Sequence, residues 1–102
     1  IMEKKSDLLN ILRQIHNNPN FSQREAAKNT GLSLGKLNYC LNALKNKGFV
    51  KMKNFKNNDN KKNYLYILTP AGVSEKTKLT LGFMKRKMKE YDDLKSELEA
   101  TK

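Results

Sequence analysis

The feature of this sequence that most restricts its fold is a continuous helical pattern of 31 residues, 70–100. Thr69 and Pro70 predict where it begins, because threonine is a good N-cap and proline is favoured at the first helical position. At 1.5 Å per residue such a helix is about 45 Å long. A compact domain of this size has a radius of gyration of only about 13 Å. In a chain of 102 residues the helix must therefore project beyond its own core.

The projecting part of this helix carries an apolar seam with the 3-4-3-7 spacing of a coiled-coil interface, interrupted by Lys95 and flanked by Leu94. A projecting apolar seam needs a partner, and a second copy of the chain is the simplest one. We therefore predict a homodimer whose interface contains Leu81, Met84, Met88, Tyr91, Leu94 and Leu98. The alternative is that the seam folds back on Ile11 and Ile15 of the same chain, which we expect only for the first part of the helix, around Val73 and Leu79.

The preceding residues predict three helices and a hairpin. The helices cover 4–16, 22–29 and 33–47, and the second and third are separated by a tight turn at 30–32. Alternating strands at 49–55 and 63–68 flank a polar loop. This order predicts a mainly α protein with a small β-hairpin. We expect a winged helix-turn-helix DNA-binding domain at 4–72 and a long C-terminal dimerisation helix at 73–100.

The third helix has the pattern of a recognition helix. Leu37, Cys40, Leu41 and Leu44 form one apolar stripe, so the opposite face is polar and rich in amides. An asparagine side chain can bond the N6 and N7 atoms of adenine together, which suits this face to reading bases. We predict DNA contacts from Ser33, Gly35, Lys36, Asn38, Tyr39 and Asn42. The alternative is an ordinary solvated helix face.

The positive charge is concentrated near this helix and the hairpin. The net charge of the chain is +11, and residues 36–62 hold eight bases against one acid, a net +7. Residues 83–102 hold six bases against five acids. Clustered positive charge attracts a phosphate backbone. We predict that Lys56, Lys61 and Lys62 in the hairpin loop contact DNA as a wing; the alternative is a solvated turn.

Four segments resemble small MarR-type winged-helix regulators associated with bacterial exopolysaccharide biosynthesis loci. They are SQREAA at 22–27, GLSLGKLNYCL at 31–41, ALKNKGFV at 43–50 and YLYILTPAG at 64–72. The resemblance extends over about 8–98. It implies a dimeric, DNA-binding transcriptional regulator that acts near polysaccharide genes, and it names no effector ligand. A dimer whose recognition helices lie about one turn of DNA apart would in turn require a near-palindromic operator.

Other classes of function find little support. The sequence has no glycine-rich phosphate loop, no histidine–carboxylate cluster and no nucleophile–base pair, so we expect neither an enzyme nor a cofactor or metal site. The longest apolar stretch, 65–68, is far too short to span a membrane, and we expect a cytoplasmic protein. Two alternatives remain open: a protein-interaction module without specific DNA readout, and binding of RNA or single strands, which the scarcity of exposed aromatics disfavours.

Overall fold

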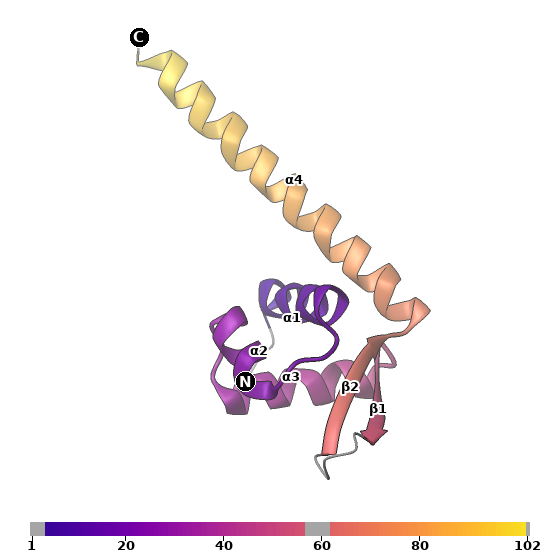
Figure 1. Cartoon of the computed structure of the whole chain (residues 1–102). Coiled ribbons are helices and arrows are strands. Elements are labelled where there is room, and N and C mark those ends of the chain that lie inside the picture. The colour runs from indigo at the N-terminus through magenta and orange to yellow at the C-terminus, as the bar shows by residue number, and fades with distance from the viewer. Residues whose placement is uncertain (1–3, 57–61, 102) are drawn as a thin grey trace.

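The computed structural model describes residues 4–56 and 62–101. The elements follow in the order α1 (Lys5–Asn17), α2 (Gln23–Thr30), α3 (Leu34–Asn46), β1 (Val50–Lys56), β2 (Lys62–Leu68) and α4 (Pro70–Ala100) (Figure 1). The two strands form an antiparallel hairpin in which Val50 pairs with Leu68 and Lys56 with Lys62. The fold is a winged helix-turn-helix followed by one long helix, as the sequence predicted.

Local side-chain caps set the starts of α2, α3 and α4. Ser22, Ser33 and Thr69 are extended N-caps whose hydroxyl oxygens accept the backbone N–H of the residue three positions later. The turn between α2 and α3 depends on Gly31, whose φ of 73° is in the left-handed region that favours glycine. All of these interactions are local, which explains why the sequence predicted the element boundaries to within one or two residues.

The core lies between the three short helices and the base of the hairpin. The stripe predicted on α3 is buried, with Leu37, Cys40, Leu41 and Leu44 each no more than 2% exposed. It packs with residues of α1, the loop that follows it, α2 and both strands: Ile11, Leu12, Ile15, Phe21, Ala26, Val50 and Tyr66. The rings of Phe21 and Tyr66 stack with centroids 5.5 Å apart. This packing fixes which side of α3 faces outward.

A compact joint connects this core to α4. The hydroxyl of Thr69 donates to the carbonyl oxygen of Gly48 at 2.6 Å and accepts the N–H of Gly72 at 3.0 Å. The N–H of Thr69 donates to the carbonyl oxygen of Phe49 at 3.1 Å. Gly72 is buried so close to this carbonyl that a β-carbon would overlap it. The first turn of α4 is therefore held directly on the backbone that leaves α3.

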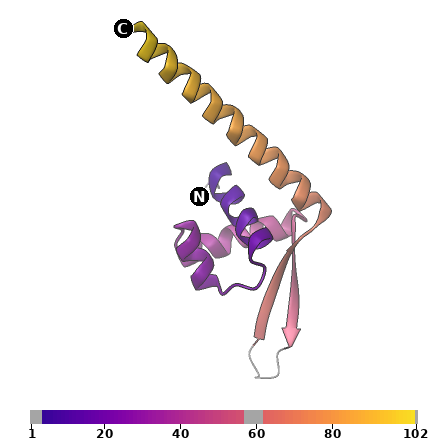
Figure 2. The same cartoon turned by 45° about the horizontal axis from the view of Figure 1, so that its top comes forward.

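From this joint α4 extends well beyond the winged domain (Figure 2). The molecule measures 65 × 26 × 26 Å, and its radius of gyration is 17.3 Å, above the compact value of about 13 Å. The first turns of α4 pack beside α1, with Leu79 against the core. No helix within residues 4–56 and 62–101 combines the length and apolar character that crossing a membrane requires.

Two packing expectations were wrong. The alternating pattern predicted at 49–55 gives Met52 the same face as Val50, and Met52 lies opposite the buried Tyr66, but it is 40% exposed because α1 packs on β2 rather than on β1. Val73 was expected to fold back beside Leu79, but it is 48% exposed. Six residues along a helix rotate by about 600°, which leaves the two side chains about 120° apart, so they leave α4 in different directions.

The joint makes a prediction about stability. Gly72→Ala places a methyl group against the Phe49 carbonyl, and we expect it to lower the free energy of unfolding by about 1–3 kcal/mol, as overpacking does. Urea unfolding at one fixed protein concentration measures this loss.

Gly82→Ala is the matched control, because Gly82 lies in the same helix with open space where its β-carbon would be. Alanine is a better helix former than glycine, so this variant should be more stable by about 0.5–1 kcal/mol. Equal stabilities of the two variants would contradict the proposed close approach.

Candidate nucleic-acid interface

The outward face of α3 is polar and accessible. Ser33, Gly35, Asn38, Tyr39 and Asn42 are all exposed, directly opposite the buried stripe. Tyr39 is 45% exposed. Gly35 has open space around it, so this end of the helix is not blocked by a side chain. Five of the six recognition-helix residues predicted from the sequence are therefore brought together on one surface.

The sixth residue, Lys36, is directed toward α1. Its Nζ is 3.0 Å from Oδ2 of Asp7 in α1, and the side chains are 31% and 16% exposed, respectively. The Asp7 oxygen is buried, and the contact is an ion pair rather than an aligned hydrogen bond. The amine predicted to contact DNA is thus held toward α1. Its role in binding stays a prediction.

Leu34 is a residue of this surface that the sequence analysis missed. It occupies the first position of α3 and is 45% exposed, although it is a large apolar residue. It lies one helical turn before Asn38, so the two share a side of the helix. The sequence carries no signal for its exposure, because Leu34 lies three residues before Leu37 and so continues the spacing of the buried stripe.

The predicted wing is only partly described. Lys56 and Lys62 are the last cross-strand pair of the hairpin, but their side chains and the whole of Lys61 lie outside the described residues. Lower on the same hairpin, Lys51 and Lys53 are exposed on β1. The part of the hairpin that is described therefore presents positive charge.

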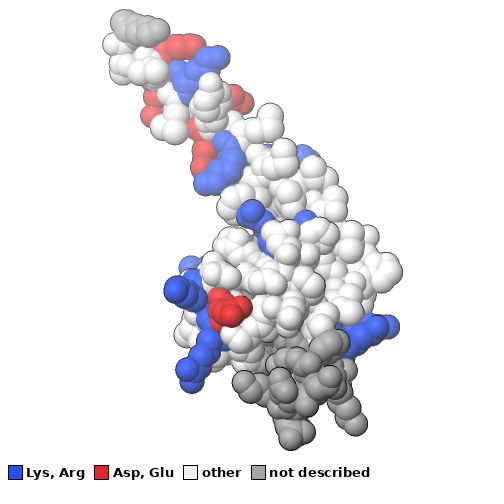
Figure 3. All heavy atoms as spheres, viewed as in Figure 1, with Lys and Arg blue, Asp and Glu red and all other residues white. Residues whose placement is uncertain are grey.

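The space-filling view separates two kinds of surface (Figure 3). Lysine and arginine side chains stand out at the left edge of the winged domain, next to one acidic patch, and beside the hairpin, whereas the outer part of α4 shows several basic and acidic side chains together. Ion pairs account for part of this mixture, with Lys87 bound to Glu90 at 3.5 Å and Lys89 to Asp93 at 3.3 Å. The charge suited to a polyanion thus belongs to the winged domain.

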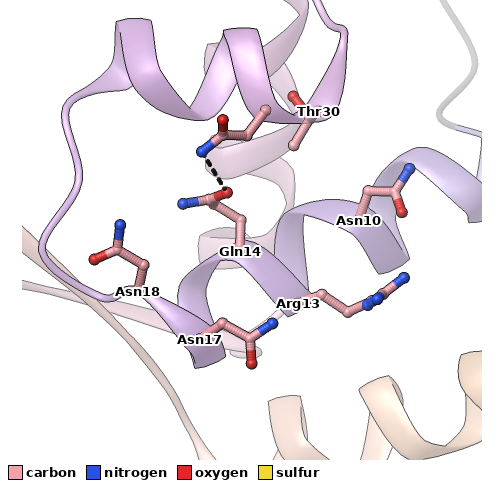
Figure 4. Close-up of a pocket in the computed structure, with 7 residues that line it drawn as sticks. Asn10, Arg13, Gln14, Asn17, Asn18 and Thr30 are labelled. Carbon is pink, nitrogen blue, oxygen red and sulfur yellow. Dashed lines mark hydrogen bonds between the residues drawn. The ribbon is translucent and has the colours of Figure 1, made fainter.

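A polar pocket lies between α1 and the end of α2, outside this surface (Figure 4). It has a volume of about 350 Å³ and includes Arg13, and Asn29 donates across it to Oε1 of Gln14 at 3.2 Å. Its lining includes no residue of α3. Among residues 4–56 and 62–101, no group of three or more histidine, cysteine, aspartate or glutamate side chains could hold a metal ion.

The projecting half of α4 presents the other notable surface. Its six predicted interface residues are 53–65% exposed: Leu81, Met84, Met88, Tyr91, Leu94 and Leu98. The half-buried residues of α4 include Leu79 and Phe83. Leu79 packs against the core, and Phe83 follows one helical turn later on the same side of the helix. The seam residues are therefore exposed in the single chain, and Leu81, nearest the body, borders a pocket that also includes Lys5 of α1.

Comparison with known proteins agrees with this architecture. A sequence family described as winged helix-turn-helix DNA-binding matches residues 8–51, from α1 through α3 into β1. No curated protein matches the chain by sequence. The fold and the outward face of α3 thus define a winged helix-turn-helix protein with a C-terminal helical extension.

Solved structures show the same fold at low identity. A MarR-family regulator from Silicibacter pomeroyi is 18% identical with a TM-score of 0.60, over 72% of this chain and 48% of that one. PcaV from Streptomyces coelicolor is 14% identical, with a TM-score of 0.65, over 93% and 76%. Lactococcus lactis ZitR, solved in complex with DNA, is 15% identical, with a TM-score of 0.64, over 91% and 61%. The chain thus has a MarR-type fold and spans about half the length of the first of these relatives.

The Asp7–Lys36 pair predicts an energetic coupling between α1 and α3. In a double-mutant cycle of Asp7→Asn and Lys36→Met, we expect a coupling of about 1 kcal/mol in urea unfolding, reduced in high salt because both groups are partly exposed. The pair Lys89–Asp93 is the control. Its side chains are 78% and 62% exposed, so its coupling should be about half as large or less. A larger coupling for the control would contradict the interpretation.

Proposed function

We propose that this chain is a MarR-type transcriptional regulator, not an enzyme, and that it binds duplex DNA through α3. The observation that carries the proposal is the pair of opposite faces on α3, one buried and the other exposed and rich in amides. In helix-turn-helix proteins such a helix enters the major groove, where amide side chains bond base edges. The family match over residues 8–51 supports the same function.

In this proposal the residues have separate roles. Asn38 and Asn42 contact base edges, while Ser33, Gly35 and Tyr39 lie against the DNA backbone or neighbouring bases. Lys56, Lys61 and Lys62 of the wing contact phosphates or the minor groove, where positive charge is favoured. Lys36 can contribute only after leaving Asp7, because its ammonium is held there in the free protein.

We also propose that the active form is a homodimer joined along the α4 seam. Six large apolar side chains, each more than half exposed, form a surface that a soluble protein rarely leaves uncovered. An isolated helix of this kind gains most of its stability from packing an apolar face. Two copies would place their recognition helices about one turn of DNA apart, about 34 Å, and so favour a near-palindromic operator.

The resemblance of residues 22–27, 31–41, 43–50 and 64–72 to exopolysaccharide-associated regulators supports one finer proposal: the target genes include polysaccharide biosynthesis genes. Genome-wide occupancy tests it directly. Occupancy confined to unrelated genes would contradict it and leave DNA binding itself intact.

The base-reading role predicts a specific mutational pattern. Asn38→Ala or Asn42→Ala should lower the preference for operator over random duplex by about 1–3 kcal/mol, because a base contact is lost. Lys61→Ala should weaken binding to all duplexes alike and reduce the salt slope by about 1. Fluorescence anisotropy at several salt concentrations measures both.

The control is Asn10→Ala, which replaces an exposed asparagine of α1 and should change neither the operator preference nor the salt slope. If the α3 changes weakened operator and random DNA equally, the assignment of base reading would be wrong.

The dimer predicts a second pattern. Met88→Lys places a charge in the middle of the seam and should shift the chain to a monomer at about 10 µM, because burying an unpaired ammonium is costly. Glu97→Gln changes the net charge by the same amount at a position outside the 3-4-3-7 spacing of the seam and should leave the dimer intact. Analytical ultracentrifugation measures both masses. A monomeric unsubstituted chain would remove the dimer proposal.

A further inference from the structure

The outward face of α3 carries a restricted set of base-reading groups. Each base pair presents its own pattern in the major groove: amides suit adenine, apolar groups suit the thymine methyl, arginine and lysine suit guanine, and carboxylates suit the cytosine amine. Helix α3 contains no acid and no arginine, and its only cations are Lys36 and Lys45. Within α3, the charged groups that suit G·C pairs are therefore limited to two lysines.

Neither lysine is well placed for that task. Lys36, in the first turn, forms the 3.0 Å ion pair with Asp7. Lys45 lies in the last turn of α3, whereas the N-terminal residues of a recognition helix make the base contacts. Using Lys36 on guanine would require breaking a pair whose carboxylate oxygen is buried. The ion pair between α1 and α3 thus removes the nearest guanine-reading group.

The groups that remain at the N-terminal half of α3 suit A·T pairs. Asn38 and Asn42 are exposed one helical turn apart, and Leu34 is exposed one turn before Asn38. Leu34 has no capping role, since Ser33 supplies the cap, and it is not part of the core cluster. A large apolar side chain at the groove-facing end of a recognition helix is well suited to contacting a thymine methyl group.

We propose that α3 is selective for A·T base pairs, with Asn38 and Asn42 on adenine and Leu34 on a thymine methyl, so that each operator half-site has an A·T core. This inference rests on the proposed DNA-binding function and adds both a specificity residue, Leu34, and a class of operator to it. Asp7 is a positioning residue here, because it acts by holding Lys36 away from the bases.

The test begins with selection of duplexes from a random pool by the full chain at low salt. The selected half-sites should share A·T pairs at their central positions. Replacing these pairs by G·C should weaken binding about tenfold or more, the value of a lost amide contact. Replacing thymine by deoxyuridine, which lacks only the methyl, should weaken binding about fourfold at one position of each half-site.

Variants at Leu34 identify the residue responsible. Leu34→Ala should bind the selected duplex about fourfold more weakly and lose its sensitivity to deoxyuridine at that position. Leu34→Met keeps an apolar side chain and should retain the sensitivity. Circular dichroism of both variants should match that of the unsubstituted chain, because position 34 is exposed.

The possible failures are distinguishable. If the chain binds selected duplexes whose central positions are G·C, or if deoxyuridine has no effect at any position, the A·T inference is overturned and DNA binding stands. If Leu34→Ala keeps full sensitivity to deoxyuridine, Leu34 is not the methyl-reading residue. If the chain binds no duplex even at low salt, the proposed function fails and the inference fails with it.

Discussion

The architecture depends on one small set of backbone contacts where β2 passes into α4. Thr69 bridges the carbonyl of Gly48 and the N–H of Gly72, and its own N–H bonds the carbonyl of Phe49. Gly72 can lie on that carbonyl only because it has no side chain. Since Gly48 and Phe49 directly follow α3, these contacts fix the start of the long helix relative to the recognition helix.

This constraint gives the two notable surfaces a defined relationship. The amide face of α3 and the apolar seam of α4 belong to elements that are joined through Thr69 rather than through a long linker. In the proposed dimer, the direction in which α4 leaves the joint sets how far apart the two recognition helices lie. The shape of the dimer, rather than additional base contacts, would then determine which spacing of half-sites it binds.

The parts of the fold and of the site that the sequence predicted are those that depend on neighbours a few residues away. The serine and threonine caps, the buried stripe Leu37–Leu44 and the exposed seam of α4 all follow from helical spacing. What the sequence did not reveal involves packing between distant segments. Met52 is exposed because α1 covers β2, and Lys36 is turned aside by Asp7, which comes from a different helix. The position of a residue within its own helix or strand does not show which residues of a distant segment lie beside it.

By itself, therefore, the sequence determined the order of the elements, the amphipathic faces of α3 and α4 and the concentration of positive charge in the winged domain. These features follow from local hydrogen bonds and from the 3.6-residue period of the helix. Only the tertiary structure decided which cation is held away from the outward face, that Leu34 is exposed, and that Gly72 lies against Phe49. Each of these depends on how segments that are far apart in the sequence approach one another in space. The spacing of residues along the chain does not encode the distance between such segments.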